Sequence, residues 1–224
     1  MKKTVLSTLL IILFLNPIFS QDWASLNRFK NENSELKKMK DPRIVLMGNS
    51  ITEGWTNFSP DFFEGKNYIN RGISGQTTPQ MLLRFRKDVI DLNPKVVVIL
   101  AGINDIAQNT GFTSIEMIAE NIMSMAELAQ HHKIEIVICS VIPAFDFPWS
   151  PGFEPADKAI ELNAILKKYA AKNNLIYVDY HTAMKDEKNG LKVPEFTSAD
   201  DLVHPNKAGY LVMEKFLGMK IWTD

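Results

Sequence analysis

The chain has 224 residues, of which 46% are hydrophobic and 23% charged, with a formal net charge of −1. This length suits one domain, and the balance of apolar and charged residues excludes disordered and fibrous proteins. The near-neutral charge argues against nucleic acid as a partner, and the single cysteine, Cys139, excludes an internal disulfide and a CxxC site.

The first residues have the layout of a secretory signal peptide. Lys2 and Lys3 precede an apolar run at 5–15, which is followed by a helix-breaking Asn-Pro pair and the small Ser20. We therefore expect a signal peptide over 1–20, an exported protein that is periplasmic or secreted, and no membrane span after cleavage. An uncleaved N-terminal anchor is the alternative, and the absence of a cysteine after the run argues against a lipid anchor.

The remaining residues, 21–224, contain no repeat or linker and are expected to form one domain. Short, mostly apolar and β-branched runs predict the strands of a parallel sheet buried on both faces. The expected strands are 43–47, 67–70, 95–101, 134–140 and 175–179.

Helices are expected between these strands, because apolar residues recur there every three or four positions. The predicted helices are 79–91, 114–131, 156–172 and about 206–217. Alternation of short strands and helices predicts a three-layer α/β/α sandwich around a mostly parallel five-stranded sheet. Ligands of such folds bind at the carboxyl ends of the strands, so the residues that follow each strand are the informative ones.

A serine, a histidine and an aspartate near these strand ends suggest nucleophilic catalysis. Ser50 follows the first strand, and a serine hydroxyl becomes a good nucleophile when a neighbouring base removes its proton. His204 is the natural base, because imidazole titrates near neutral pH. Asp201, three residues earlier, suits the carboxylate that orients the imidazole.

Donors for a developing oxyanion follow the same strands. Gly75 offers a backbone N–H without a side chain in the way, Asn104 offers its amide NH₂, and the Ser50 N–H is a third donor. The sequence therefore predicts an acyl-transfer site with these residues as its oxyanion hole.

Four segments resemble the four motifs of the SGNH, or GDSL-type, hydrolase family. GNSIT resembles the motif that carries the nucleophile, here Ser50, and GISGQTT the motif of the oxyanion glycine, Gly75. GIND resembles the motif of the oxyanion asparagine, Asn104, and DLVHPNKAGY the motif of Asp201 and His204. The resemblance spans nearly the whole domain and implies the flavodoxin-like SGNH fold and a serine esterase without a cofactor.

Two positions depart from the family pattern. Asn49 stands where the family usually has aspartate, and Leu202 replaces a common glycine. We expect changed hydrogen bonding at the first position and a changed loop shape at the second. Within the family, the chain is most similar to bacterial relatives of platelet-activating-factor acetylhydrolase and to carbohydrate O-acetylesterases.

Each candidate residue also has a simpler interpretation. Ser50 suits a helix N-cap, and Asp200 is an alternative acid beside Asp201. Asp201 with His204 resembles a metal pair, but no third ligand is evident, so we expect no metal. His181 follows the last strand and is interpreted as structural.

The segment 143–153 is rich in aromatic residues and follows the fourth strand. Its Phe147 and Trp149 are candidates for substrate binding, and covering the sheet edge is the equally favoured alternative. The sequence thus predicts an exported serine esterase for short-chain, acetyl esters of a small molecule or carbohydrate. A lysophospholipase or thioesterase with longer acyl preference, a non-catalytic carbohydrate-binding domain and a flavodoxin-like nucleotide binder are the alternatives.

Overall fold

The protein is described by a computed structural model that covers residues 22–38, 41 and 43–221, so the signal peptide expected over 1–20 lies outside the described residues. Five parallel strands form one sheet in the order β2-β1-β3-β4-β5. The strands are β1 (Ile44–Gly48), β2 (Tyr68–Gly72), β3 (Val96–Leu100), β4 (Glu135–Cys139) and β5 (Ile176–Val178). All five predicted strands are present, with ends that differ by one or two residues.

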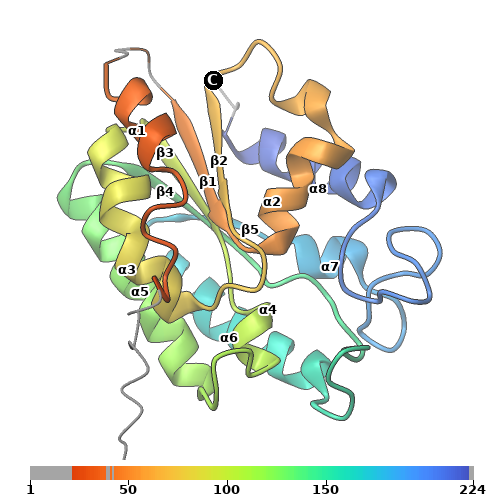
Figure 1. The fold of residues 1–224 in the computed structure, drawn as a ribbon. Coiled ribbons are helices and arrows are strands. Elements are labelled where there is room, and N and C mark those ends of the chain that lie inside the picture. The colour runs from red at the N-terminus through yellow and green to blue at the C-terminus, as the bar shows by residue number, and fades with distance from the viewer. Residues whose placement is uncertain (1–21, 39–40, 42, 222–224) are drawn as a thin grey trace, which may run out of the picture.

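Helices cover both faces of the sheet, which confirms the predicted three-layer fold (Figure 1). The face with α3, α5 and α6 also carries α1, and the other face carries α2, α7 and α8. The helices are α1 (Lys30–Leu36), α2 (Ser50–Phe58), α3 (Thr78–Asp88), α4 (Ile103–Ile106), α5 (Ile115–His131), α6 (Pro155–Lys172), α7 (Tyr180–Met184) and α8 (Lys207–Ile221), with 3₁₀ turns η1 (Pro60–Phe62) and η2 (Ile90–Leu92). Among the described residues, no helix is both long and apolar enough to span a membrane.

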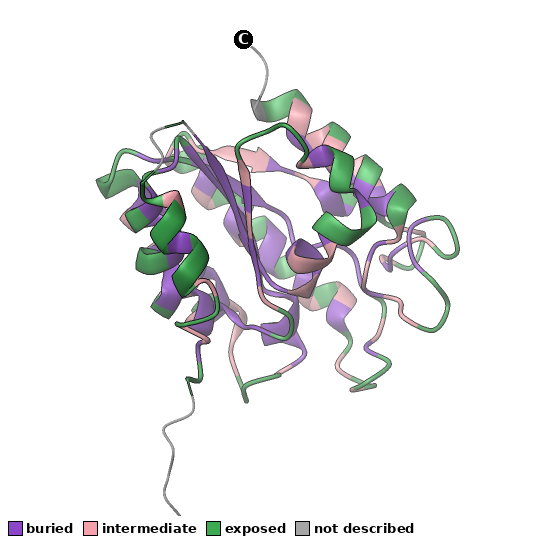
Figure 2. Cartoon of the chain, turned by 45° about the horizontal axis from the view of Figure 1, so that its top comes forward, coloured by how far each residue is buried: buried purple, intermediate pink, exposed green. Residues whose placement is uncertain are grey.

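The central strands carry the core. Every residue of β1 and β3 is buried, and the helices turn their buried sides toward the sheet (Figure 2). The strand register aligns Gly48 with both Gly72 and Leu100, so β1, β2 and β3 end side by side. The loops that follow these three strands therefore begin at one edge of the sheet.

A fully buried guanidinium, that of Arg84 in α3, joins the ends of β1 and β2. Its Nη2 donates to the backbone carbonyl of Gly48 at 3.0 Å and to that of Arg71 at 2.8 Å. Its Nε donates to Gln76 Oε1 at 2.6 Å, and its Nη1 pairs with the buried carboxylate of Asp88 at 3.1 Å. A buried charge is costly unless it is paired and hydrogen-bonded, and all three nitrogens of this group have an acceptor.

A second buried arginine, Arg71, attaches α1 to the same network. Its Nε and Nη2 donate to Asn33 Oδ1 at 3.1 and 2.7 Å, and its Nη1 pairs with Glu32 at 2.9 Å. Asn33 Nδ2 in turn donates to Asp88 Oδ1 at 2.7 Å. Polar contacts, more than an apolar face, thus fix α1 on the domain.

We expect Arg84→Leu to destabilise the protein strongly, because the change leaves the buried Asp88 carboxylate without its ion-pair partner and removes a donor from the carbonyls of Gly48 and Arg71. Breaking a buried ion pair costs about 3–5 kcal/mol in the free energy of unfolding. Arg86→Leu is the control, since Arg86 is exposed on the same helix and should cost less than about 0.5 kcal/mol. Urea unfolding of the two variants measures both values, and equal losses would contradict the prediction.

Candidate active site

The four sequence motifs meet at the carboxyl edge of the sheet. Ser50 is the first residue of α2, directly after β1, and Gly75 lies in the loop between β2 and α3. Asn104 lies in the short α4 after β3, and Asp201 and His204 lie in the turn that precedes α8. The short connections after three adjacent parallel strands bring the first three residues together, and the position of α8 on the α2 face brings the last two to them.

A continuous hydrogen-bond chain joins the three candidate catalytic residues. Ser50 Oγ lies 2.9 Å from His204 Nε2. His204 Nδ1 lies 2.8 and 3.0 Å from the two carboxylate oxygens of Asp201. The backbone N–H of His204 also donates to Asp201 Oδ1 at 2.8 Å, and this bond helps to hold the carboxylate in position beside the imidazole ring. A serine, a base and an orienting acid in this order can support nucleophilic attack on a carbonyl.

Both departures from the family pattern have a structural counterpart. Asn49 is buried and is the N-cap of α2, where its Oδ1 accepts from the N–H of Ile51 at 3.1 Å. An amide oxygen therefore fills the cap, and Ser50 itself is not the cap. Leu202 has a φ of +64°, a left-handed conformation that favours glycine, so this leucine carries backbone strain of about 1–2 kcal/mol.

Three N–H donors lie on the loops around Ser50. Gly75 has a φ of +76°, which favours glycine, and no acceptor within the described residues takes its N–H or that of Ser50. The Asn104 side chain is buried, and its Nδ2 donates to the Gln76 carbonyl at 3.0 Å. That bond uses one of the two amide hydrogens and leaves the other for a ligand.

A buried carboxylate next to Asn104 holds the start of α3. Asp105 accepts the N–H of Thr78 at 2.9 and 3.0 Å and its hydroxyl at 2.6 Å. Burial raises the pKa of Asp105 to about 6, although the bonds from Thr78 act in the opposite direction. The geometry therefore supports a structural role for Asp105, and nothing in the sequence indicated its elevated pKa.

The aromatic segment after β4 divides into buried and exposed rings. Phe147 is fully buried, so its predicted contact with substrate is wrong: the ring lies beneath Trp149, with 5.2 Å between their centroids. Trp149 is 48% exposed, and its ring lies 6.2 Å from that of His204. Trp149 alone of the two predicted aromatic residues is placed to touch a ligand.

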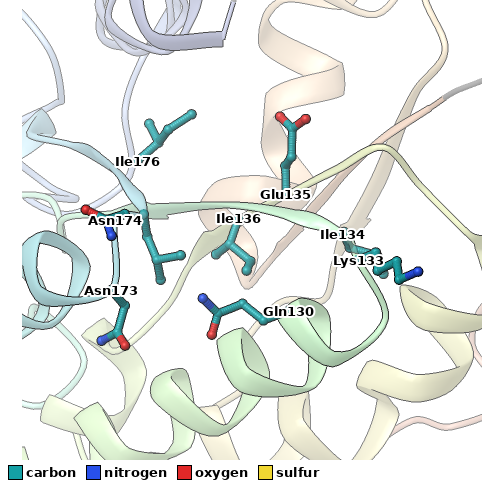
Figure 3. Close-up of a pocket in the computed structure, with 9 residues that line it drawn as sticks. Gln130, Lys133, Ile134, Glu135, Ile136, Asn173, Asn174 and Ile176 are labelled. Carbon is teal, nitrogen blue, oxygen red and sulfur yellow. The ribbon is translucent and has the colours of Figure 1, made fainter.

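A pocket of about 360 Å³ adjoins the hydrogen-bond chain, and its lining consists of Pro148, Trp149, Ser198, Asp200, Asp201 and His204. A larger pocket of about 560 Å³ lies at the amino ends of β4 and β5, where Figure 3 places Ile136 among the amides of Gln130 and Asn173. No residue of the four motifs lines this larger pocket. Size alone therefore does not identify the active site here.

The remaining candidates have other surroundings. Asp200 makes no hydrogen bond to His204 in the described structure, so Asp201 is the acid that the geometry favours. His181 is buried, and its backbone N–H donates to Ser140 Oγ at 2.9 Å. Burial lowers the pKa of its imidazole, and both observations fit a structural role. Within the described ranges, no three histidine, cysteine or acidic residues are grouped so that they could hold a metal ion.

Comparison with known proteins gives a family match over most of the chain. The sequence model of the GDSL-like lipase/acylhydrolase family matches residues 46–212, which include all four motifs. A solved structure of a proposed acylhydrolase from Bacteroides fragilis NCTC 9343 is 45% identical. It superposes with a TM-score of 0.84, and the similarity covers 89% of this chain and 96% of that one.

Two curated relatives are more distant. The acetylxylan esterase of Geobacillus stearothermophilus is 23% identical over 155 residues, which cover 67% of this chain and 70% of the esterase. An uncharacterized lipoprotein of Bacillus subtilis (strain 168) is 30% identical over 120 residues, or 46% of this chain. That match spans only about half, 49%, of the length of the lipoprotein.

The elevated pKa of Asp105 predicts a pH dependence of stability. Between about pH 4 and pH 6 the folded protein retains the Asp105 proton while the unfolded chain loses it, so stability falls as the pH rises through this range. The shift corresponds to about 3 kcal/mol in the free energy of unfolding. We expect Asp105→Asn to remove this slope in urea unfolding measured from pH 4 to pH 7. An unchanged difference between the two proteins across this range would contradict the prediction.

Proposed function

Because the chain belongs to the GDSL-like lipase/acylhydrolase family, and is therefore a serine ester hydrolase, we propose that it cleaves short-chain acyl esters through Ser50, His204 and Asp201. The observation that carries this proposal is the hydrogen-bond chain from Ser50 Oγ through His204 to Asp201. It stands beside the unengaged N–H groups of Ser50 and Gly75 and the amide of Asn104.

The proposed reaction begins when His204 Nε2 accepts the Ser50 hydroxyl proton as Oγ attacks the ester carbonyl. The carbonyl oxygen gains negative charge, which the N–H groups of Ser50 and Gly75 and the Asn104 amide stabilise. His204 then donates its proton to the departing alcohol, and an acyl-enzyme remains. Water, deprotonated by His204, then attacks the acyl carbon; the bond to Ser50 Oγ breaks, His204 returns the proton to Oγ, and the acid is released. Asp201 stabilises the imidazolium in both halves of the reaction.

Acetyl esters of carbohydrate are the substrate class we propose. The support comes from a curated relative, which is an acetylxylan esterase, and from the exposed Trp149 ring beside His204. Aromatic rings in binding sites present a flat apolar face on which a sugar ring can lie.

Export is also part of the proposal. It rests on the signal-peptide pattern of 1–20 and on the relative from Bacillus subtilis, which is a lipoprotein. A protein delivered to the periplasm or beyond would meet polymeric carbohydrate esters.

A fluorophosphonate probe tests the nucleophile independently of the substrate. We expect one covalent adduct by intact mass on the wild-type protein and none on Ser50→Ala. Asn104→Ala should slow labelling by about 10²–10³, because one oxyanion donor is lost. Asn109→Ala is the matched control, since its exposed amide donates only to the Gly75 carbonyl and should have a much smaller effect. Labelling that persists in Ser50→Ala would refute the assignment.

Acyl chain length separates the proposal from a lysophospholipase or thioesterase. For p-nitrophenyl esters from acetyl to octanoyl, we expect kcat/KM to fall as the acyl chain lengthens, because we propose acetyl esters as the substrates, in line with the similarity to an acetylxylan esterase. A maximum at octanoyl would favour the longer-chain alternative. No hydrolysis of any ester by a folded protein that also resists the probe would favour a carbohydrate-binding domain.

A further inference from the structure

The pocket beside His204 contains polar groups that the protein itself does not use. The indole N–H of Trp149, the hydroxyl of Ser198 and the carboxylate of Asp200 all belong to residues of its lining. None of these groups makes a hydrogen bond or ion pair within the described part of the chain. The Trp149 ring packs against the buried ring of Phe147. An aromatic face together with a free N–H, hydroxyl and carboxylate suits a polar organic group.

The position of the pocket identifies which part of an ester it takes. His204 must return its proton to the alcohol oxygen, so that oxygen lies next to His204 Nε2 in the reaction. The proposed oxyanion donors Gly75 and Asn104 do not belong to the lining of this pocket. The group that extends past His204 into the pocket is therefore the alcohol portion of the ester.

The charge of the lining residues determines which charge on the alcohol portion the pocket favours. Asp201 is engaged by His204, whereas Asp200 is exposed and has no cationic partner among the described residues. The lining contains no lysine or arginine. A negatively charged alcohol would thus approach an unpaired carboxylate without compensation, while a cationic one would gain an attraction to Asp200 and to the Trp149 face.

We infer that Asp200 is a specificity-determining residue, and that the pocket accepts neutral or cationic alcohol portions and discriminates against those bearing phosphate, sulfonate or carboxylate. The inference rests on the proposed function and adds to it the charge class of the substrate. It also gives a role to the acid that is not in the hydrogen-bond chain of Ser50 and His204.

Three acetyl esters of similar size test this inference: those of choline, of 3,3-dimethylbutanol and of isethionate, which are cationic, neutral and anionic. For each we would measure kcat/KM with the full mature chain and with Asp200→Asn and Asp200→Lys. We expect the ratio of kcat/KM for the choline ester to kcat/KM for the isethionate ester to fall about tenfold in Asp200→Asn. About threefold comes from slower hydrolysis of the choline ester and about threefold from faster hydrolysis of the isethionate ester. Asp200→Lys should lower it by a similar factor again. The ratio in the wild type should shrink in about 1 M salt, where the Debye length is about 3 Å.

Glu135→Gln is the charge-matched control, because Glu135 is exposed at the opposite, amino end of β4. It should leave the ratio unchanged. A ratio that is the same in Asp200→Asn as in the wild type, or that changes equally in Glu135→Gln, would overturn the inference while leaving the esterase assignment intact. Failure of the wild type to hydrolyse the neutral ester and to react with the fluorophosphonate would instead overturn the proposed function, and the inference with it.

Discussion

The buried guanidinium of Arg84 is the constraint on which the geometry of the site depends. A cation without access to water must have every N–H group matched by an acceptor, and here the acceptors include the carbonyls of Gly48 and Arg71. These carbonyls lie at the ends of β1 and β2, just before Ser50 at the start of α2 and the loop that carries Gly75. Any relative movement of these two segments would break hydrogen bonds to a buried charge that water cannot reach. The segments of the proposed oxyanion hole are therefore held by the same interaction that holds the sheet to α3.

The same helix also reaches the third motif, which closes a ring of contacts. Arg84 binds the side chain of Gln76, and the Gln76 carbonyl accepts from Asn104. Asp105, next in sequence, returns to α3 through Thr78 at its first turn. Three motifs far apart in the sequence thus share one rigid support. Electrostatic stabilisation of an oxyanion requires donors that are oriented before the reaction, and such a ring provides that orientation.

The sequence indicated the candidate reactive residues, but it did not indicate the buried polar contacts that hold their loops in place. Ser50 and His204 could be proposed from the sequence because nucleophilic catalysis requires particular residue types at the strand ends, and the structure places the two side chains 2.9 Å apart. The helix α1 was missed because its one buried residue is the polar Asn33, so no apolar periodicity marks it. Arg84 was missed because an arginine in a helix is normally on the surface, and burial depends on partners from three other segments. Phe147 was misplaced because composition does not reveal which aromatic residues of a loop point inward.

The two sides of Ser50 are built differently, and this difference explains which properties of the site a family resemblance can reveal. The side with the proposed oxyanion donors is formed by short connections that are hydrogen-bonded to α3, and its residues belong to recognisable motifs. The alcohol side is formed by the loop of Trp149 and the turn of Ser198 and Asp200, where the polar groups are exposed and unengaged. Such residues can change without loss of stability, because nothing in the core depends on them. The motifs therefore indicate the class of reaction, whereas the choice of alcohol that we propose depends on exposed residues outside the motifs, Asp200 above all.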